Sequence, residues 1–374
     1  MRSWQSVSGG YYTSYPVRLA IVKAFTYQGQ PARVVFGAGT VASLPEEAAR
    51  LDLSRLLVLS TAGQSALAAK IAGGLGHRAA GVFSGALMHT PSDVTGRVLQ
   101  QAAALRADGV VAVGGGSTTG LGKAIAWRTD LPQLVLPTTF AGSEMTPILG
   151  ETADGVKKTF SSPRVLPEVV IYDVDLTLDV PPALAGVSGM NAIAHAIEAL
   201  YARDRNPVIR LLALEAIGVL ARALPAIIAD PADREARGEA LYGAWLCGIC
   251  LGSVGMALHH KVCHVLGGTF GLPHAQTHAV VLPYSLAYNL SAIEDVDALA
   301  AALGASDAVE GVRALNRNIA APASLAELGM PEEGIEHAAE QTLADAYWNP
   351  RPLEQRAIRE LIARARRGAE PLRL

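Results

Sequence analysis

Residues 109–126 read GVVAVGGGSTTGLGKAIA, and they combine a strand, a turn and a helix in one short segment. The valine-rich run predicts a buried strand ending at Val113, Gly114–Gly116 predict a tight turn, and a helix is expected from about Ser117. Glycines let the backbone approach a phosphate, and a helix N-terminus attracts its negative charge. The segment is not a GxGxxG fingerprint and lacks the downstream acid that usually holds a ribose. It therefore favours a phosphate-binding turn, although a tight turn without a ligand has the same pattern.

The chain on either side of this segment alternates strands and helices as far as Val174. Strands are predicted over residues 33–39, 55–60, 79–84, 109–116, 134–137 and 168–174, with helices over 65–75, 92–107 and 120–128 between them. Such alternation predicts parallel strands with crossover helices on both faces. After Pro181-Pro182 every pattern is helical.

The fold class expected is an α/β N-terminal domain with a mostly parallel, Rossmann-like sheet, followed by an all-α C-terminal domain. We expect an N-terminal extension over residues 1–24, a dinucleotide-binding domain over 25–181 and a helical catalytic domain over 182–374. Ligands prefer the cleft that such a pair of domains leaves between them.

Composition narrows the classes of function. The 374 residues are 50% hydrophobic and 17% charged, with a net charge of −3, so nucleic acid is not an expected partner. Three clustered cysteines, Cys247, Cys250 and Cys263, are no disulfide framework and favour a reducing cytoplasm over a redox or metal role. Residues 241–258 carry no charge but are at the lower limit for a membrane span, so we expect a helix buried on all sides and no membrane partner.

A second turn follows the next strand. LVLPTTFAGSEMT, residues 134–146, places Thr138, Thr139, Ser143 and Thr146 just after the strand. Polar groups at the carboxyl ends of neighbouring parallel strands are where a dinucleotide would lie. A cluster that caps a following helix is the simpler alternative, and both can hold.

Six of the nine histidines lie between residues 195 and 278 in the helical half: His195, His259, His260, His264, His274 and His278. His195 follows Asn191 by four positions, and His264 follows His260 by four, so each pair projects from one helix face. His274 is expected in the loop GLPHAQTH. Imidazoles converging from separate segments indicate a metal site or a proton-transfer site, whereas any single one could be a satisfied core group. HKVCH lacks the glutamate of the H-E-x-x-H hydrolases.

Four motifs carry a resemblance to a known family: GGGSTTGLGK, PTTFAGSEMTP, GMNAIAHAIEALYA and HHKVCHVLGGTFGLPHAQTHAVVLP. Together they resemble the iron-containing (group III) alcohol dehydrogenase superfamily, and within it the maleylacetate reductase branch. The similarity runs from about Phe25 to the C-terminus.

The resemblance implies NADH or NADPH bound across the interdomain cleft and a homodimer. The cofactor-binding residues that it implies are Gly114, Gly115, Gly116 and Ser117 at the pyrophosphate, Thr138, Thr139, Ser143 and Thr146 along the cofactor, and Lys157 or Lys158 near the nicotinamide ribose. Ser60 and Thr61 follow a strand after which many relatives carry an Asp for the ribose 2′-hydroxyl, so NADPH should be accepted beside NADH.

Departures from the family pattern bear on the metal. Metal-dependent members use one Asp and three His; here Asn191 stands at the Asp position, and His195, His260 and His274 match the His positions. Gly120 replaces the acid of the family's GGGSxxDxAK. Three histidines alone can hold zinc, but conjugate reduction of an enone does not strictly need a Lewis acid. We predict a metal-independent enzyme.

The function expected from the resemblance is NAD(P)H-dependent reduction of the carbon–carbon double bond of maleylacetate to 3-oxoadipate, in the degradation of aromatic compounds. The candidate catalytic residues are His264 (proton donor or enolate stabiliser), His260, His195, His274 and Lys261; Arg351 is a further candidate carboxylate anchor or else a surface residue. The alternatives are a metal-dependent, NAD-linked alcohol or polyol dehydrogenase, a dehydroquinate-synthase-like lyase, and a nucleotide-binding module without chemistry.

Overall fold

A computed structural model describes residues 25–29, 32–153 and 156–373. Six parallel strands form one sheet in the order β1-β8-β5-β4-β2-β3. The strands are β1 (Arg33–Phe36), β2 (Leu56–Leu59), β3 (Ala79–Phe83), β4 (Gly109–Gly114), β5 (Gln133–Pro137) and β8 (Val169–Tyr172). The predicted fold class is confirmed, and each predicted strand is present within a few residues of its expected bounds.

Helices cover both faces of this sheet, since its strands are apolar on both sides. In β2, Leu56 and Val58 pack with the core under α1 and α2, whereas Leu57 and Leu59 pack under α3 and α4. These helices are α1 (Leu44–Arg50), α2 (Ser65–Leu75), α3 (Ser92–Ala104) and α4 (Gly116–Thr129). The six-residue strand β4 is fully buried and leads directly into α4, as the strand–turn–helix pattern predicted.

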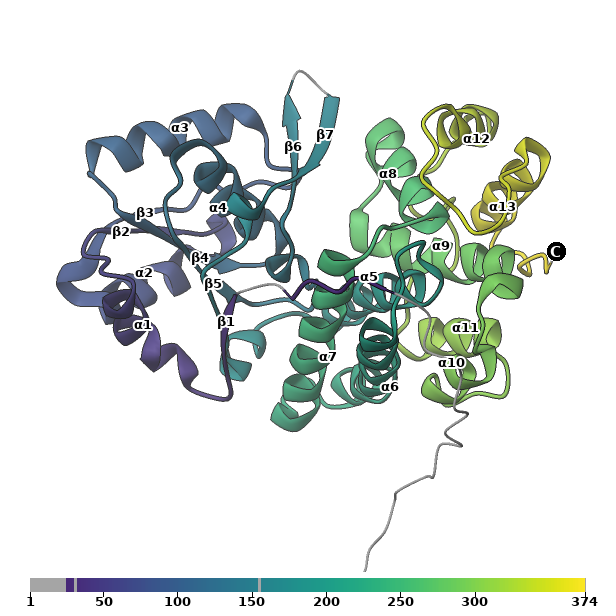
Figure 1. The fold of residues 1–374 in the computed structure, drawn as a ribbon, viewed down its shortest axis with the longest axis horizontal. Coiled ribbons are helices and arrows are strands. Elements are labelled where there is room, and N and C mark those ends of the chain that lie inside the picture. The colour runs from purple at the N-terminus through teal and green to yellow at the C-terminus, as the bar shows by residue number, and fades with distance from the viewer. Residues whose placement is uncertain (1–24, 30–31, 154–155, 374) are drawn as a thin grey trace, which may run out of the picture.

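The rest of the chain is helical and forms the second half of the molecule, which Figure 1 shows to the right of the α/β half. Its helices are α5 (Pro182–Tyr201), α6 (Pro207–Ala229), α7 (Arg234–Ser253), α8 (Leu258–Phe270), α9 (His274–Asn289), α10 (Val296–Ala302), α11 (Ala308–Asn318), α12 (Gly334–Ala344) and α13 (Gln355–Arg367). The largest core cluster joins α5, α6, α7 and α9 to Val170 and Tyr172 of β8, so apolar packing continues between the halves.

Three features differ from the sequence-based expectations. An antiparallel hairpin of β6 (Ile148–Ala153) and β7 (Val156–Ser161) was not predicted, although the Asp154-Gly155 dipeptide is a hairpin signal. The apolar stretch 241–258 is not one helix: α7 ends at Ser253, and α8 begins at Leu258 at an angle of 96° to it. His274 is not in a loop but is the first residue of α9.

Two helices among the described residues, α5 and α6, have the length and hydropathy of a membrane span. The most apolar window of α5 is 83% buried inside the protein, and that of α6 is 50% buried. The apolar character of α5 is therefore largely accounted for by packing within this chain.

Candidate active site

A large cleft, about 1110 Å³ in volume, lies between the two halves of the molecule. Residues that follow β2, β4 and β5 line one side of it, and residues of α5, α8 and α9 line the other. The carboxyl ends of parallel strands are the usual place for a ligand in an open α/β sheet. The cleft therefore brings together the two groups of residues that the sequence singled out.

The glycine turn forms the floor on the α/β side. Gly115, Gly116 and Ser117 line the cleft where α4 begins. Gly114 has φ +150°, and a Cβ there would meet the Thr118 hydroxyl oxygen at 2.5 Å. The turn thus requires a residue without a side chain, and the uncapped N-terminus of α4 faces the cleft.

The turn after β5 lies beside it. Thr138, Thr139, Ser143 and Thr146 all line the cleft. Gln64 Nε2 donates to Thr138 Oγ1 over 2.9 Å and so joins this turn to the segment after β2. These hydroxyls and backbone groups form a continuous polar wall against which a dinucleotide could lie.

Lys123, to which the sequence analysis gave no role although it ends the GGGSTTGLGK motif, holds this wall in place. Its Nζ donates to the carbonyl oxygens of Ser143, Thr146 and Ile148 at 2.6, 2.7 and 3.0 Å. Burial lowers the pKa of Lys123 to about 7, an effect that the charge of Glu144 opposes. Its hydrogen bonds show that it cross-links α4 to the loop after β5.

The opposite wall carries the imidazoles. Asn191 and His195 of α5, His260 and His264 of α8, and His274 of α9 line the cleft. The rings of His195 and His260 stack with centroids 5.0 Å apart, and those of His264 and His274 stack at 6.3 Å. The fold thus brings together the candidate residues from three separate helices.

A buried carboxylate that the sequence analysis missed orients His260. Glu198 is fully buried, and its Oε2 lies 2.6 Å from His260 Nδ1. Its oxygens also accept hydrogen bonds from the backbone N–H groups of Ala257 and His259. Burial alone would raise the pKa of Glu198, but the charge and hydrogen bond of His260 bring it below its ordinary value. An ionised Glu198 fixes Nδ1–H on His260 and would stabilise an imidazolium formed there. The sequence feature that could have identified Glu198 is its place as a glutamate in a largely apolar motif, three residues after His195.

His264 has a different partner. Its Nδ1 lies 3.0 Å from the hydroxyl of Tyr347, which also lines the cleft. Burial raises the pKa of Tyr347, followed by the charges of Asp345 and Glu198, so the phenol stays protonated and can donate. Tyr347 is a second residue that sequence reasoning missed, because it comes from a distant segment beyond α12.

Several polar atoms on this wall have no hydrogen-bond partner within the described part of the chain. Asn191 Oδ1, His195 Nδ1, His260 Nε2 and His278 Nε2 are all buried and unpaired there. Burial, followed by the charges of His260 and His274, holds the pKa of His195 well below its usual value. Asn191, His195 and His260 line the cleft, so their unpaired buried atoms are suited to bind a ligand there.

Three predicted site residues, Ser60, Lys158 and Lys261, are not among the described residues that line the cleft. Ser60 is fully buried and its hydroxyl donates to Ser84, so Thr61, which lines the cleft, takes its expected place. Lys158 is exposed on β7 and is not a lining residue, and the side chain of Lys157 lies outside the described residues. Lys261 Nζ lies 5.7 Å from the Tyr347 ring centroid, and Lys261 does not line the cleft.

Arg351 is held away from the cleft. It stacks 4.5 Å from the ring centroid of Tyr288 and donates to the Tyr288 carbonyl oxygen. Arg351 is not among the described residues that line the cleft, which favours the alternative that it has no part in binding the substrate.

Comparisons with known proteins agree with this geometry. Residues 31–174 match the family described as iron-containing alcohol dehydrogenase, and residues 186–366 match the C-terminal part of the Fe-containing alcohol dehydrogenase family. The chain belongs to the iron-containing alcohol dehydrogenase family. The resemblance that the motifs indicated is thereby confirmed, and the chain is an oxidoreductase.

Within this family the chain is similar to maleylacetate reductases. It is 55% identical to the maleylacetate reductase of Rhizobium sp. (strain MTP-10005), over 94% of this chain and 100% of the relative. It is 53% identical to that of Burkholderia cepacia, with the same coverage of both chains. The crystal structure of maleylacetate reductase from Agrobacterium tumefaciens superposes with a TM-score of 0.90 at 53% identity, over 93% of this chain and 100% of that one.

The family's metal can be tested against the residues present. His260 Nε2, with Nδ1 held by Glu198, has the orientation that metal-binding histidines usually receive from a carboxylate behind them. Three imidazoles fit a zinc-like cation, but Asn191 contributes a neutral oxygen where the family has a charged one. The residues therefore fit a divalent cation held by three histidines, without the anionic ligand that metal-dependent members of the family have.

The described lining of the cleft is poor in carboxylates. Asp179 is the one acidic residue in it, against Lys123 and five histidines, which are His89, His195, His260, His264 and His274. Gly120 stands at the family's acidic position, and a Cβ there would meet Thr90 Oγ1 at 2.4 Å. Thr90 therefore occupies the space that an acidic side chain would need, which lowers the negative charge in the cleft.

Proposed function

We propose that the protein reduces the carbon–carbon double bond of maleylacetate to 3-oxoadipate with NADH or NADPH, in the breakdown of aromatic compounds. The observation that carries the proposal is the Glu198–His260 pair, which faces a nucleotide-type turn across a cleft with a single acidic lining residue among those described. A dianionic substrate would be repelled by carboxylates, and this cleft has few of them. The similarity to maleylacetate reductases supports the same substrate.

The chemistry follows from the two walls of the cleft. When bound, NAD(P)H would supply a hydride for the double bond, and the electron pair of that bond would move through conjugation onto the keto oxygen. His260, backed by Glu198, is placed to meet this developing charge as an imidazolium. His264 delivers a proton to the neighbouring carbon, and His195 and His274 complete the wall. Lys261 is given no part because it does not line the cleft.

The nucleotide lies along the other wall in this proposal. Gly114–Ser117 receive the pyrophosphate, and the hydroxyls after β5 contact the rest of the cofactor. Thr61, not an acidic residue, lines the cleft after β2, so no carboxylate there repels a 2′-phosphate and both NADH and NADPH are accepted.

We propose that the reaction proceeds without a metal. A divalent cation would be held by His195, His260 and His274 with Asn191 beside them, and it would supply Lewis acidity at the keto oxygen. The missing anionic ligand weakens such binding, and a protonated His260 can do the same work. Metal analysis of the purified enzyme and of N191D tests this. Little metal in the first and gain of an ion in the second are expected, whereas one tightly held ion in the wild type with activity lost on chelation would overturn the proposal.

The assay for the function follows NAD(P)H absorbance. Oxidation of NADH and NADPH with maleylacetate, and no reaction of NAD⁺ with short alcohols or polyols, is expected. Reaction with alcohols only would establish the metal-dependent dehydrogenase instead, and no reaction with either would leave nucleotide binding alone.

The cysteines bear on the cellular compartment of the protein. The free cysteines Cys247, Cys250 and Cys263 are buried and suit the cytoplasm. We place the enzyme there as a homodimer, acting on a small dicarboxylate, with neither nucleic acid nor membrane as a partner.

A further inference from the structure

A connection between two of the last helices reaches the cleft. Residues 345–354 join α12 to α13 without forming a helix or a strand, and Tyr347 is the residue of this connection that lines the cleft. The Tyr347 hydroxyl lies 3.0 Å from Nδ1 of His264, the residue that delivers the proton in the proposed mechanism. The place of Tyr347 therefore depends on the contacts that hold an irregular stretch of chain.

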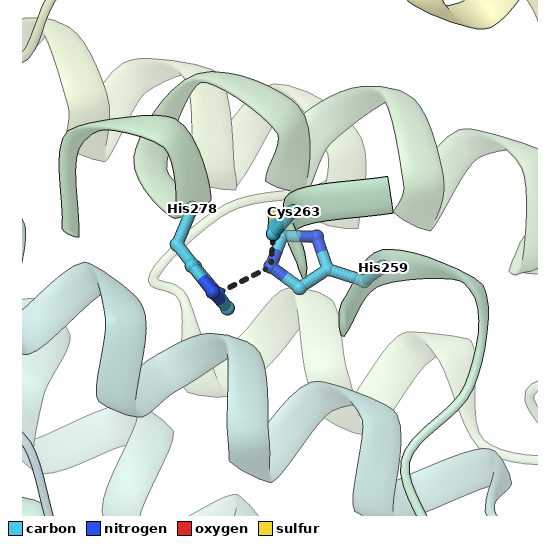
Figure 2. Close-up of side chains that lie close together, drawn as sticks. All are labelled: His259, Cys263 and His278. Carbon is cyan, nitrogen blue, oxygen red and sulfur yellow. Dashed lines mark hydrogen bonds between the residues drawn. The ribbon is translucent and has the colours of Figure 1, made fainter. Parts of the chain in front are cut away.

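The two helices next to this connection, α8 and α9, are joined to each other by buried polar contacts. Figure 2 shows His259 of α8 with its Nε2 3.0 Å from Nδ1 of His278 in α9, and with Cys263 Sγ beside it at 3.7 Å. Nδ1 of His259 lies 2.9 Å from Oγ of Ser285, also in α9. His259, His278 and Ser285 are all 0% exposed. The two helices therefore form one support for the connection.

Asn349 attaches the connection to this support through every hydrogen-bonding position of its amide. Its Oδ1 accepts from the backbone N–H of Leu258 at 3.4 Å and from Asn289 Nδ2 at 2.8 Å. Its Nδ2 donates to Asn289 Oδ1 at 2.9 Å and to the carbonyl oxygen of Arg351 at 2.7 Å. An asparagine amide offers two N–H hydrogens and an oxygen with two lone pairs, so all four positions are used.

The backbone partners of Asn349 determine which way its amide points. The Leu258 N–H can only donate and the Arg351 carbonyl can only accept, so Oδ1 must face α8 and Nδ2 must face the connection. Leu258 is the first residue of α8, and the first N–H groups of a helix need acceptors from outside it. Asn289 is the last residue of α9 and is 0% exposed. One side chain thus ties the connection to an end of each helix.

Tyr347, two residues before Asn349, lies against the side of α8 that carries His264. Nζ of Lys261 is 5.7 Å from the centroid of the Tyr347 ring, and the hydroxyl of the same ring reaches His264. Lys261 and His264 are three positions apart, so they are neighbours on one side of the helix. Both contacts of the Tyr347 side chain therefore require that the connection keep its position along α8.

The chain on the far side of Asn349 has contacts of its own. Arg351 donates to the carbonyl oxygen of Tyr288 and stacks on the Tyr288 ring, and the Tyr288 hydroxyl donates to the carbonyl oxygen of Pro352 at 2.6 Å. These contacts reach α9 but not α8. Asn349 is closer along the chain to Tyr347 and bonds to the start of α8, where His264 is placed.

We propose that Asn349 is a positioning residue, which holds residues 345–354 on α8 and α9 so that the Tyr347 hydroxyl keeps its hydrogen bond to His264. This inference rests on the proposed function, because His264 delivers the proton there. Asn349 is not among the described residues that line the cleft, so it acts on the reaction through Tyr347 and does not touch the substrate.

A double-mutant cycle tests this route. Y347F removes the hydroxyl and N349A removes the amide that places it, so each should lower kcat with maleylacetate about 3- to 10-fold and leave the KM for NADH unchanged. Because both losses have the same cause, the double variant Y347F/N349A should be no slower than the slower single variant. Full kcat in N349A, or a loss in the double variant equal to the product of the two single losses, overturns the proposal.

Two further variants separate positioning from general destabilisation. N349D keeps the acceptor for Leu258 but loses both donors, so its kcat should fall as in N349A. N206A is the matched control, since Asn206 Oδ1 accepts from the N–H of Ile209 and caps α6 away from the cleft. N206A should lower the urea midpoint and keep full kcat. Equal loss of kcat in N206A and N349A contradicts a positioning role.

Hydrogen exchange gives a readout that needs no turnover. In the whole enzyme, the backbone amide of Leu258 should exchange about 3- to 10-fold faster in N349A than in the wild type, because its acceptor is lost. Y347F keeps that acceptor and should leave the exchange of Leu258 unchanged. Equal exchange in N349A and the wild type overturns the attachment of the connection to α8. Failure to reduce maleylacetate with this exchange pattern intact would refute the proposed function alone.

Discussion

Single residues set the chemistry of the cleft through the partners behind them. Glu198 holds one nitrogen of His260, Tyr347 binds one nitrogen of His264, and both histidines line the cleft. A histidine can act as acid, base or ligand, and it is the second hydrogen bond that selects among these roles. Neither Asn191 nor Gly120 carries a carboxylate, so both positions leave the cleft with less negative charge, which favours binding of an anionic substrate.

His264 provides the prediction at this scale. Removing a positioned general acid costs about 10²–10⁴ in rate, so H264A should lose that much kcat while the KM for NADH, bound on the opposite wall, stays unchanged. Y347F keeps the ring and removes only the hydrogen bond to His264, and a loss below about tenfold is expected for such a supporting contact. Steady-state rates with maleylacetate measure both, and full turnover of H264A would remove His264 from the proton-donor role.

At the level of elements, the backbone of α7 closely approaches the loop after β5, and this contact joins the two halves of the molecule. A Cβ on Gly248 of α7 would lie 2.3 Å from the carbonyl oxygen of Gly142, and one on Gly252 would lie 2.9 Å from that of Met145. The small residues of the stretch 241–258 thus let α7 contact the loop after β5, which also carries Ser143 and Thr146. The same loop is held from the other side by Lys123.

G248A should therefore be destabilising. The methyl group meets backbone that cannot move aside, and overpacking of this kind costs about 1–3 kcal/mol. G96A in α3 is the matched control, because nothing lies within 4 Å of its Cβ. Alanine in that helix should raise stability by about 1 kcal/mol. Urea unfolding of the three proteins measures the difference, and a G248A midpoint equal to that of the wild type would contradict the packing argument.

For the whole molecule, the burial of several imidazoles should make the free energy of unfolding fall at acidic pH. Burial is the largest cause that holds the pKa of His195 and His278 well below the usual value and lowers that of His259 to about 3. Below pH 6.5 the unfolded chain binds protons at these residues and the folded chain does not. Stability then rises with pH, and it is lost as the pH falls.

The free energy of unfolding should drop by about 1.4 kcal/mol per pH unit for each such histidine between pH 6.5 and the folded pKa values. Urea midpoints at pH 7, 6 and 5 measure this slope. H278N should reduce it, whereas H77N, at an exposed position in the α/β half, should leave it unchanged. A midpoint independent of pH over this range would mean that the rings become charged in the folded state.

Periodicity and turn chemistry determined much of the fold from the sequence alone. The alternation of strands and helices gave a parallel sheet, Pro181-Pro182 marked the start of the helical half, and Gly114–Gly116 marked the nucleotide turn, because these signals are local. Motif order and spacing also named the histidines that line the cleft. Ser60, Lys158 and Lys261 do not line the cleft, because spacing along a chain does not say which side chains reach a cavity.

Only the tertiary structure determined which residues are the hydrogen-bond partners of those histidines. Glu198 and Tyr347 lie tens of residues from the rings of His260 and His264, and they meet these rings only when α5 and the segment after α12 pack against α8. Hydrogen bonds across such distances leave no periodic trace in a single sequence. The sequence therefore predicted which histidines belong to the site, whereas packing determined which hydrogen-bond partner His260 and His264 have.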